Sequence, residues 1–143
     1  MAARSESAER RLLQAAVALC ALIPILAGLA GVLCGLRAFD RHAGWSLTGD
    51  SHVRYLSGLI LAIGLGFWST VPGIEAQGPR FRLLTALVLV GGMARLYALL
   101  RFGPPAGGML GGLVMELMVT PVLAIWRETL ERRTRKATAR TLA

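Results

Sequence analysis

The chain contains an uncharged stretch of 25 residues, LLQAAVALCALIPILAGLAGVLCGL, which runs from Leu12 to Leu36. A helix that crosses the hydrocarbon core of a bilayer needs about 20 consecutive, mostly apolar residues. This stretch is long enough to span a membrane with some tilt. Because it exceeds the about 7–15 apolar residues of a typical signal-peptide core, we interpret it as a retained membrane helix rather than a cleaved signal.

Three further apolar runs follow, at residues 55–71, 83–100 and 109–126. The last two are each interrupted by a single charged residue, Arg95 and Glu116 respectively. Proline and glycine punctuate the connections, as expected for turns between helices. The sequence therefore predicts an all-α integral membrane protein, an antiparallel up-down-up-down four-helix bundle with helices at about 12–36, 55–71, 83–100 and 109–126.

The composition supports this fold class and excludes others. Hydrophobic residues make up 55% of the chain and charged residues only 17%, with a formal net charge of +8. Soluble domains are about 45–50% apolar and about 25% charged, so an ordinary soluble domain is excluded. A nucleic-acid-binding protein needs a polar, basic face, and too few polar residues remain to build one.

The basic residues predict the orientation. Eleven lie in the N-terminal segment, the 72–82 loop and the stretch from Arg127 to the C-terminus, and four lie in or beside the other connections. Because cytoplasmic loops carry the excess of Lys and Arg, we expect both termini in the cytoplasm. Residues 1–11 would then be a cytoplasmic segment, residues 12–127 the transmembrane domain, and residues 128–143 a basic cytoplasmic tail. The tail could also contact anionic lipid head groups, and its last dozen residues are polar enough to predict disorder.

Arg95 and Glu116 are the most informative residues. A charge near the middle of a bilayer costs at least about 2.5–3.5 kcal/mol, so it normally faces the bundle interior with a partner. On adjacent antiparallel helices, both residues would lie about 10 Å below the outer surface at 1.5 Å per residue. Matched depth and opposite charge predict an ion pair.

Arg54 lies directly before the second apolar run, on the same outer side of the membrane as Arg95 and Glu116. It either extends to the interface or turns inward, where two guanidiniums would share one carboxylate. A surplus positive charge there would attract an anionic head group, a carboxylate or a polarised carbonyl. The candidate site is therefore Arg54, Arg95 and Glu116, with a possible periphery of Asp50, His52, Tyr55 and Ser57.

Three interpretations of this cluster remain open: it fixes helix register only, it binds a lipid or other ligand, or it moves protons or ions. No nucleophile–base arrangement is present, so no catalytic residue is assigned. His42 and His52 lie ten residues apart in or near the outer loop, without the tight spacing of metal ligands. We expect neither a metal ion nor a cofactor.

Two patterns concern helix packing. Small residues recur at four-residue spacing in three of the runs, which favours close approach of helices within the bundle, or else a homodimer face. In the fourth run Thr120 precedes Pro121, and its hydroxyl can bond back to the helix where proline removes a donor.

Several short motifs carry a resemblance to a known family. The segment Arg54-Tyr55-Leu56-Ser57-Gly58 and the later Gly91-Gly92-Met93-Ala94-Arg95, Gly103-Pro104 and Glu116 resemble domain-of-unknown-function family 4345 over residues 12–127. The resemblance implies a small bacterial four-helix membrane protein, distantly similar to the DoxX-like group, and implies no activity. The family's recurrent Arg and Glu fall on Arg54, Arg95 and Glu116.

We therefore expect a multi-pass protein of the bacterial cytoplasmic (inner) membrane. The favoured function is non-enzymatic: a membrane component or accessory subunit whose cluster binds a lipid or quinone-like head group. Its partners would be the lipid bilayer and a second copy or a partner membrane subunit. The alternatives are an enzyme acting on a lipophilic substrate with Glu116 as acid/base, or a proton-coupled carrier.

Overall fold

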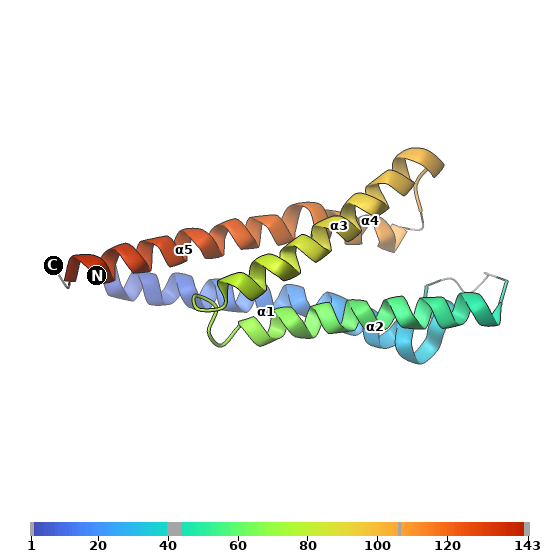
Figure 1. The fold of residues 1–143 in the computed structure, drawn as a ribbon, viewed down its shortest axis with the longest axis horizontal. Coiled ribbons are helices and arrows are strands. Elements are labelled where there is room, and N and C mark those ends of the chain that lie inside the picture. Colours follow the sequence, from blue (N-terminus) through green and yellow to red (C-terminus); the bar gives the residue numbers. More distant parts are fainter. Residues whose placement is uncertain (1, 40–43, 106, 142–143) are drawn as a thin grey trace. The chain divides into compact units, whose positions relative to one another are not determined.

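The computed structural model describes residues 2–39, 44–105 and 107–141. In chain order the elements are α1 (Ala2–Cys34), a 3-10 turn η1 (Gly35–Ala38), α2 (Leu47–Thr70), α3 (Gly78–Phe102), α4 (Gly107–Val114), a π-helical turn η2 (Met115–Val119) and α5 (Thr120–Thr141), as Figure 1 shows. Because α4, η2 and α5 follow one another without a break, they act as one long helix.

Four described segments are long and apolar enough to cross a membrane, namely Ser7–Ala38, Leu47–Thr70, Gly78–Phe102 and Gly108–Lys136. The predicted all-α membrane protein with four helices is therefore confirmed. The alternating direction of all four helices in a single bundle stays a prediction.

The chain forms two compact units. One comprises residues 15–71, and the other comprises residues 1–14 together with residues 72–143. Each unit contains a helical hairpin, and different contacts hold the helices of the two hairpins together.

In the first unit, α1 and α2 pack backbone against backbone. A Cβ atom at Gly28 would lie 2.6 Å from the backbone nitrogen of Leu61, and one at Gly64 would lie 2.9 Å from that of Ile25. Residues later in α1 thus meet residues earlier in α2, which makes the pair antiparallel. Since lipid tails offer no hydrophobic drive for helix association, this close approach is what holds such a hairpin together.

The small-residue pattern predicted part of this interface. Gly31 does lie against α2, because a Cβ atom at this position would collide with the Ser57 side chain. Gly58 does not: a Cβ there would meet no atom within 4 Å. Gly28 and Gly64, which lie outside the four-residue pattern, make the tightest backbone contacts instead. A helix face is set by 3.6 residues per turn, so a strict spacing of four drifts away from it.

In the second unit, α3 runs antiparallel to the continuous α4–η2–α5 helix. Gly78 near the start of α3 contacts Arg127 of α5, and Gly92 further along α3 contacts Leu117 of η2. Figure 1 shows α3 running alongside this helix. The most buried side chains of the unit are Leu13, Ile74, Phe81, Arg127 and Leu130.

Each of the four predicted helices extends beyond one or both of its predicted ends; α1, for example, begins at Ala2. α2 begins at Leu47, well before Tyr55, because the Ser46 hydroxyl accepts a hydrogen bond from the Gly49 amide (3.1 Å) and caps the helix. α5 continues to Thr141, so the disorder predicted for the last dozen residues is wrong. Ion pairs spaced four residues apart support this extension, as between Glu131 and Arg135 (2.7 Å).

Candidate functional site: an arginine–glutamate pair in the second unit

The site begins with Pro121. Proline lacks an amide hydrogen, and its ring crowds the carbonyl four residues earlier, so it disturbs the hydrogen bonding of the helical turn before it. The chain relaxes into the π-helical turn η2, and the Thr120 hydroxyl donates to the Met115 carbonyl (2.9 Å). The predicted back-bonding by Thr120 is thus confirmed. Single π-helical turns inside α-helices are found frequently at functional sites, and this one contains Glu116.

Gly92 brings α3 close to this turn. A Cβ atom at Gly92 would lie 2.9 Å from the Cβ of Glu116 and 2.7 Å from a methyl carbon of Leu117. Its neighbour Gly91 faces open space, with no atom within 4 Å of such a Cβ. Because Arg95 follows Gly92 by three residues, both lie on the same face of α3. The glycine therefore sets the separation at which Arg95 can reach Glu116.

Arg95 and Glu116 form a two-pronged ion pair. The Arg95 Nε donates to Oε2 of Glu116 and its Nη2 donates to Oε1, each over 3.0 Å. Such bidentate pairs are the strongest class of side-chain hydrogen bond and also fix the relative orientation of both groups. The arrangement ties α3 to η2 at the level where the apolar helices would otherwise carry two isolated charges.

The pair leaves part of the guanidinium for other partners. Met109 of α4 offers its sulfur to Nη1, and a thioether is a weak acceptor. Within the described part of the chain, the second hydrogen of Nη1 and of Nη2 meets no acceptor. The Arg95 side chain is 30% exposed and that of Glu116 is 22% exposed, so both are only part-buried.

Arg54 is engaged within the first unit. Its Nε donates to Asp50 (2.7 Å), and its Nη1 donates to the carbonyl oxygens of Val32 and Leu33 at the end of α1. The last carbonyls of a helix lack partners in their own helix, so a cation that binds them caps it. That Arg54 also faces Arg95 and Glu116 stays a prediction.

The predicted periphery divides between two faces of α2. Asp50 accepts from the Leu36 amide (2.9 Å), and Ser57 is buried against Gly31, so both face α1. Gly35 allows this junction because its φ of +60° starts the turn η1 and a Cβ there would collide with Asp50. His52 and Tyr55 face elsewhere and line a separate, open surface pocket.

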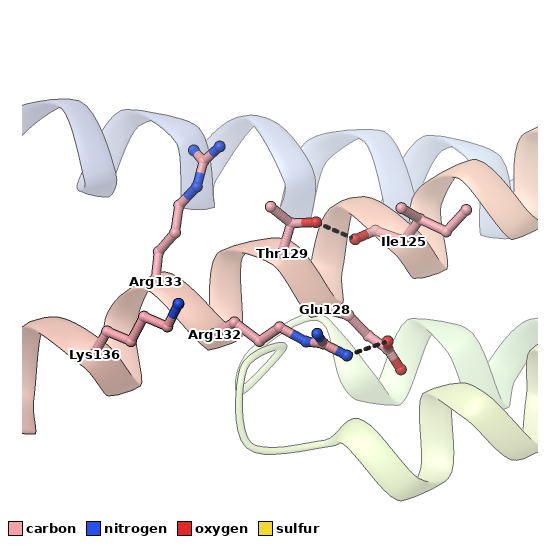
Figure 2. Close-up of a pocket in the computed structure, with 6 residues that line it drawn as sticks. All are labelled: Ile125, Glu128, Thr129, Arg132, Arg133 and Lys136. Carbon is pink, nitrogen blue, oxygen red and sulfur yellow. Dashed lines mark hydrogen bonds and ion pairs between the residues drawn. The ribbon is translucent and has the colours of Figure 1, made fainter.

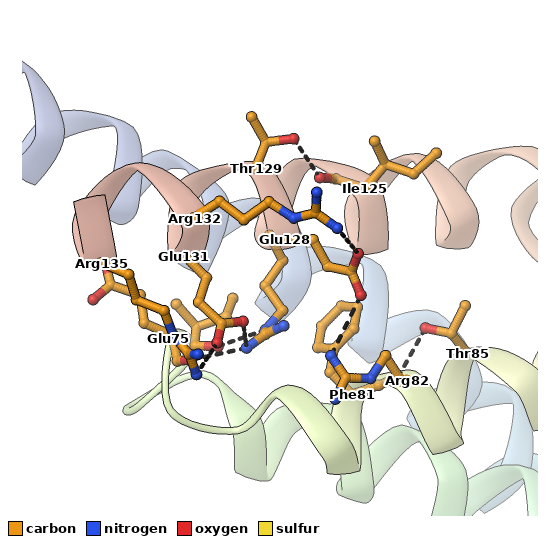
Figure 3. A network of polar contacts seen from close by, with 12 residues as sticks. Glu75, Phe81, Arg82, Thr85, Ile125, Glu128, Thr129, Glu131, Arg132 and Arg135 are labelled. Carbon is orange, nitrogen blue, oxygen red and sulfur yellow. Dashed lines mark hydrogen bonds and ion pairs between the residues drawn. The ribbon is translucent and has the colours of Figure 1, made fainter. Parts of the chain in front are cut away.

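Arg127 is a residue whose role the sequence does not indicate. Counted as one of the tail charges, it is instead 1% exposed and binds backbone: Nε to the Ile74 carbonyl and Nη2 to the Glu75 carbonyl, both 2.8 Å. Glu131 balances the charge of Arg127 (2.8 Å) and also binds Arg135. Figure 3 shows Glu131 together with Arg135. Arg127 thus fastens the loop between α2 and α3 to α5.

The described residues offer no alternative centre for a metal ion. Among them no three His, Cys, Asp or Glu side chains gather closely enough to hold one. His42 lies outside the described residues, so its position relative to His52 is not part of the structure.

These features define a class: a multi-pass, all-α membrane protein with an ion pair between two of its apolar helices. The chain belongs to the family described as domain of unknown function (DUF4345), whose model matches residues 12–127. The family assignment made from the short motifs is therefore confirmed. Comparison with curated proteins and comparison with solved structures each found no match.

The ion pair is tested by a double-mutant cycle in detergent. Glu116→Ala leaves an uncompensated guanidinium between apolar helices, so we expect the free energy of unfolding to fall by about 2 kcal/mol. Adding Arg95→Ala should recover part of this loss, with a coupling of about 1 kcal/mol. Arg101→Ala, an exposed arginine on the same helix, is the matched control and should show no coupling to Glu116→Ala. Strictly additive losses for Arg95 and Glu116 would contradict the pair.

Proposed function

We propose that the protein is a non-enzymatic membrane component, acting as an accessory subunit, whose Arg95–Glu116 site binds an oxygen-bearing head group. The ligand is the polar end of a lipid or of a quinone-like molecule. Both present carbonyl or phosphate oxygens, which are the acceptors that a guanidinium prefers.

One observation carries this proposal: the third contact of the Arg95 guanidinium is with the sulfur of Met109. A carbonyl or phosphate oxygen is a much stronger acceptor than a thioether and can replace it at Nη1. The ligand need not break the ion pair, because Glu116 uses Nε and Nη2 only. The same pair therefore holds the hairpin and presents donors to a ligand.

The geometry favours binding over acid–base chemistry. Both carboxylate oxygens of Glu116 accept hydrogen bonds from Arg95, so both are directed at the guanidinium. A general acid must carry a proton, and a general base must turn an oxygen toward the proton that it removes. Glu116 would have to leave Arg95 to do either.

Substitutions at Met109 test the site without removing a charge. Met109→Gln places an amide oxygen beside Nη1, where it competes with a ligand, whereas Met109→Leu removes the sulfur and keeps the volume. With decylubiquinone or phosphatidylethanolamine as probe, native mass spectrometry should show about fivefold lower occupancy for Met109→Gln than for wild type. Met109→Leu should bind at least as well as wild type. Equal binding by the two variants, or no adduct of either probe on the wild type, would overturn the proposal.

We further propose that the protein resides in the bacterial cytoplasmic membrane with both termini in the cytoplasm. The supporting observation is the distribution of basic residues, eleven on the side of the termini and four on the other.

A reporter fused after Ala143 tests this orientation. A fluorescent protein that matures only in the cytoplasm should be bright, and alkaline phosphatase at the same position should be inactive. The matched fusion is at Gly44, in the connection between α1 and α2, where the two results should be reversed. Active phosphatase at the C-terminus would contradict the orientation.

A further inference from the structure

One face of α5 forms an open groove that the proposed site does not use. The lining residues follow helical spacing along a single stripe, and they are Ile125, Glu128, Thr129, Arg132, Arg133 and Lys136. Residues three, four, seven, eight and eleven positions apart lie on the same face of a helix. The groove encloses about 420 Å³, and Figure 2 shows its lining side chains along α5.

The groove changes character along its length. Ile125 at one end is an apolar side chain that is 66% exposed. The Thr129 hydroxyl donates to the Ile125 carbonyl (2.8 Å), so its hydrogen is turned back to the helix. At the other end lie Arg132, Arg133 and Lys136, all exposed. A helical rise of 1.5 Å per residue places the two ends about 16 Å apart.

The positive end is only loosely neutralised. Arg132 lies 4.0 Å from Glu128, and Arg133 lies 3.5 Å from Glu9. Lys136 takes part in no ion pair among the described residues. By contrast Glu131, which does not line the groove, holds Arg127 and Arg135 at 2.8 and 2.7 Å. The three groove cations therefore keep most of their capacity to bind an anion.

We propose that this groove binds the phosphate of an anionic phospholipid, with the part of the acyl chain next to the head group lying against Ile125. Arg132, Arg133 and Lys136 donate to the phosphate oxygens, as guanidinium and ammonium groups do in phosphate sites generally. Free phosphate shares this chemistry, but it gives no reason for an exposed isoleucine at the end of the same groove. The groove lies at the C-terminal end of the candidate span Gly108–Lys136, where apolar residues give way to charged ones. Basic residues at such a junction attract anionic lipid head groups.

The proposal is tested with full-length protein in detergent and phosphatidylglycerol as probe. Each basic residue near a lipid surface contributes about a fivefold factor in affinity, so Arg132→Gln/Arg133→Gln/Lys136→Gln should weaken binding about 100-fold. The matched control is Arg10→Gln/Arg11→Gln/Arg135→Gln, which removes the same charge from exposed positions outside the groove. This control should change the affinity less than about fivefold. Thermal unfolding of both variants checks that they fold.

Two further arms distinguish the source of the phosphate. Ile125→Ser should weaken phosphatidylglycerol binding by about tenfold, because it removes the apolar contact for the acyl chain. Inorganic phosphate at the same concentration should not displace the lipid. Equal losses in the two triple variants would overturn the site, and displacement by inorganic phosphate would overturn the assignment to a lipid. Because Arg95 and Glu116 are intact in every variant, failure here leaves the proposed function standing.

Discussion

A charge placed within an apolar helix must find an opposite charge, and Arg95 and Glu116 meet this requirement for each other. The two-pronged geometry fixes both the distance and the rotation of α3 against the π-helical turn. Other features of the second unit follow from it. Gly92 removes the side chain that would keep the helices apart, and Pro121 lies just after the π-helical turn that contains Glu116. The ion pair thus sets the contact between α3 and η2, while the most buried side chains of the unit, Leu13, Ile74, Phe81, Arg127 and Leu130, complete the packing.

In the first unit, other contacts hold the two helices together. Its helices meet through glycine backbones at Gly28 and Gly64, and a pair of polar residues, Asp50 and Arg54, closes the end of α1. Arg54 therefore has a structural task within its own hairpin, whatever else it contacts. The two units illustrate the two forces available in lipid, close van der Waals packing and hydrogen bonding between helices.

How much was predictable depends on whether the signal was local. Uninterrupted apolar runs predict membrane helices because the length of the run decides whether it can span a bilayer. The pairing of Arg95 with Glu116 follows from counting the residues between each of them and the connection that joins their two helices. Arg127 could not be found in this way. It follows an apolar run directly and opens the charge-rich stretch that ends the chain, so nothing local separates it from a solvated charge. Only the fold brings the carbonyls of Ile74 and Glu75 to it.

The contact between Arg95 and Glu116 is the interaction on which the arrangement of α3 and η2 depends. Solid-state NMR of protein reconstituted in lipid, with ¹⁵N-labelled arginine and ¹³C-labelled glutamate, measures this contact directly. We expect a cross-peak between the Arg95 guanidinium and the Glu116 carboxylate that disappears in Glu116→Gln and in Arg95→Gln but persists in Arg101→Gln. Spectra that do not change in either pair variant, or a wild-type spectrum that lacks the cross-peak, would contradict the contact.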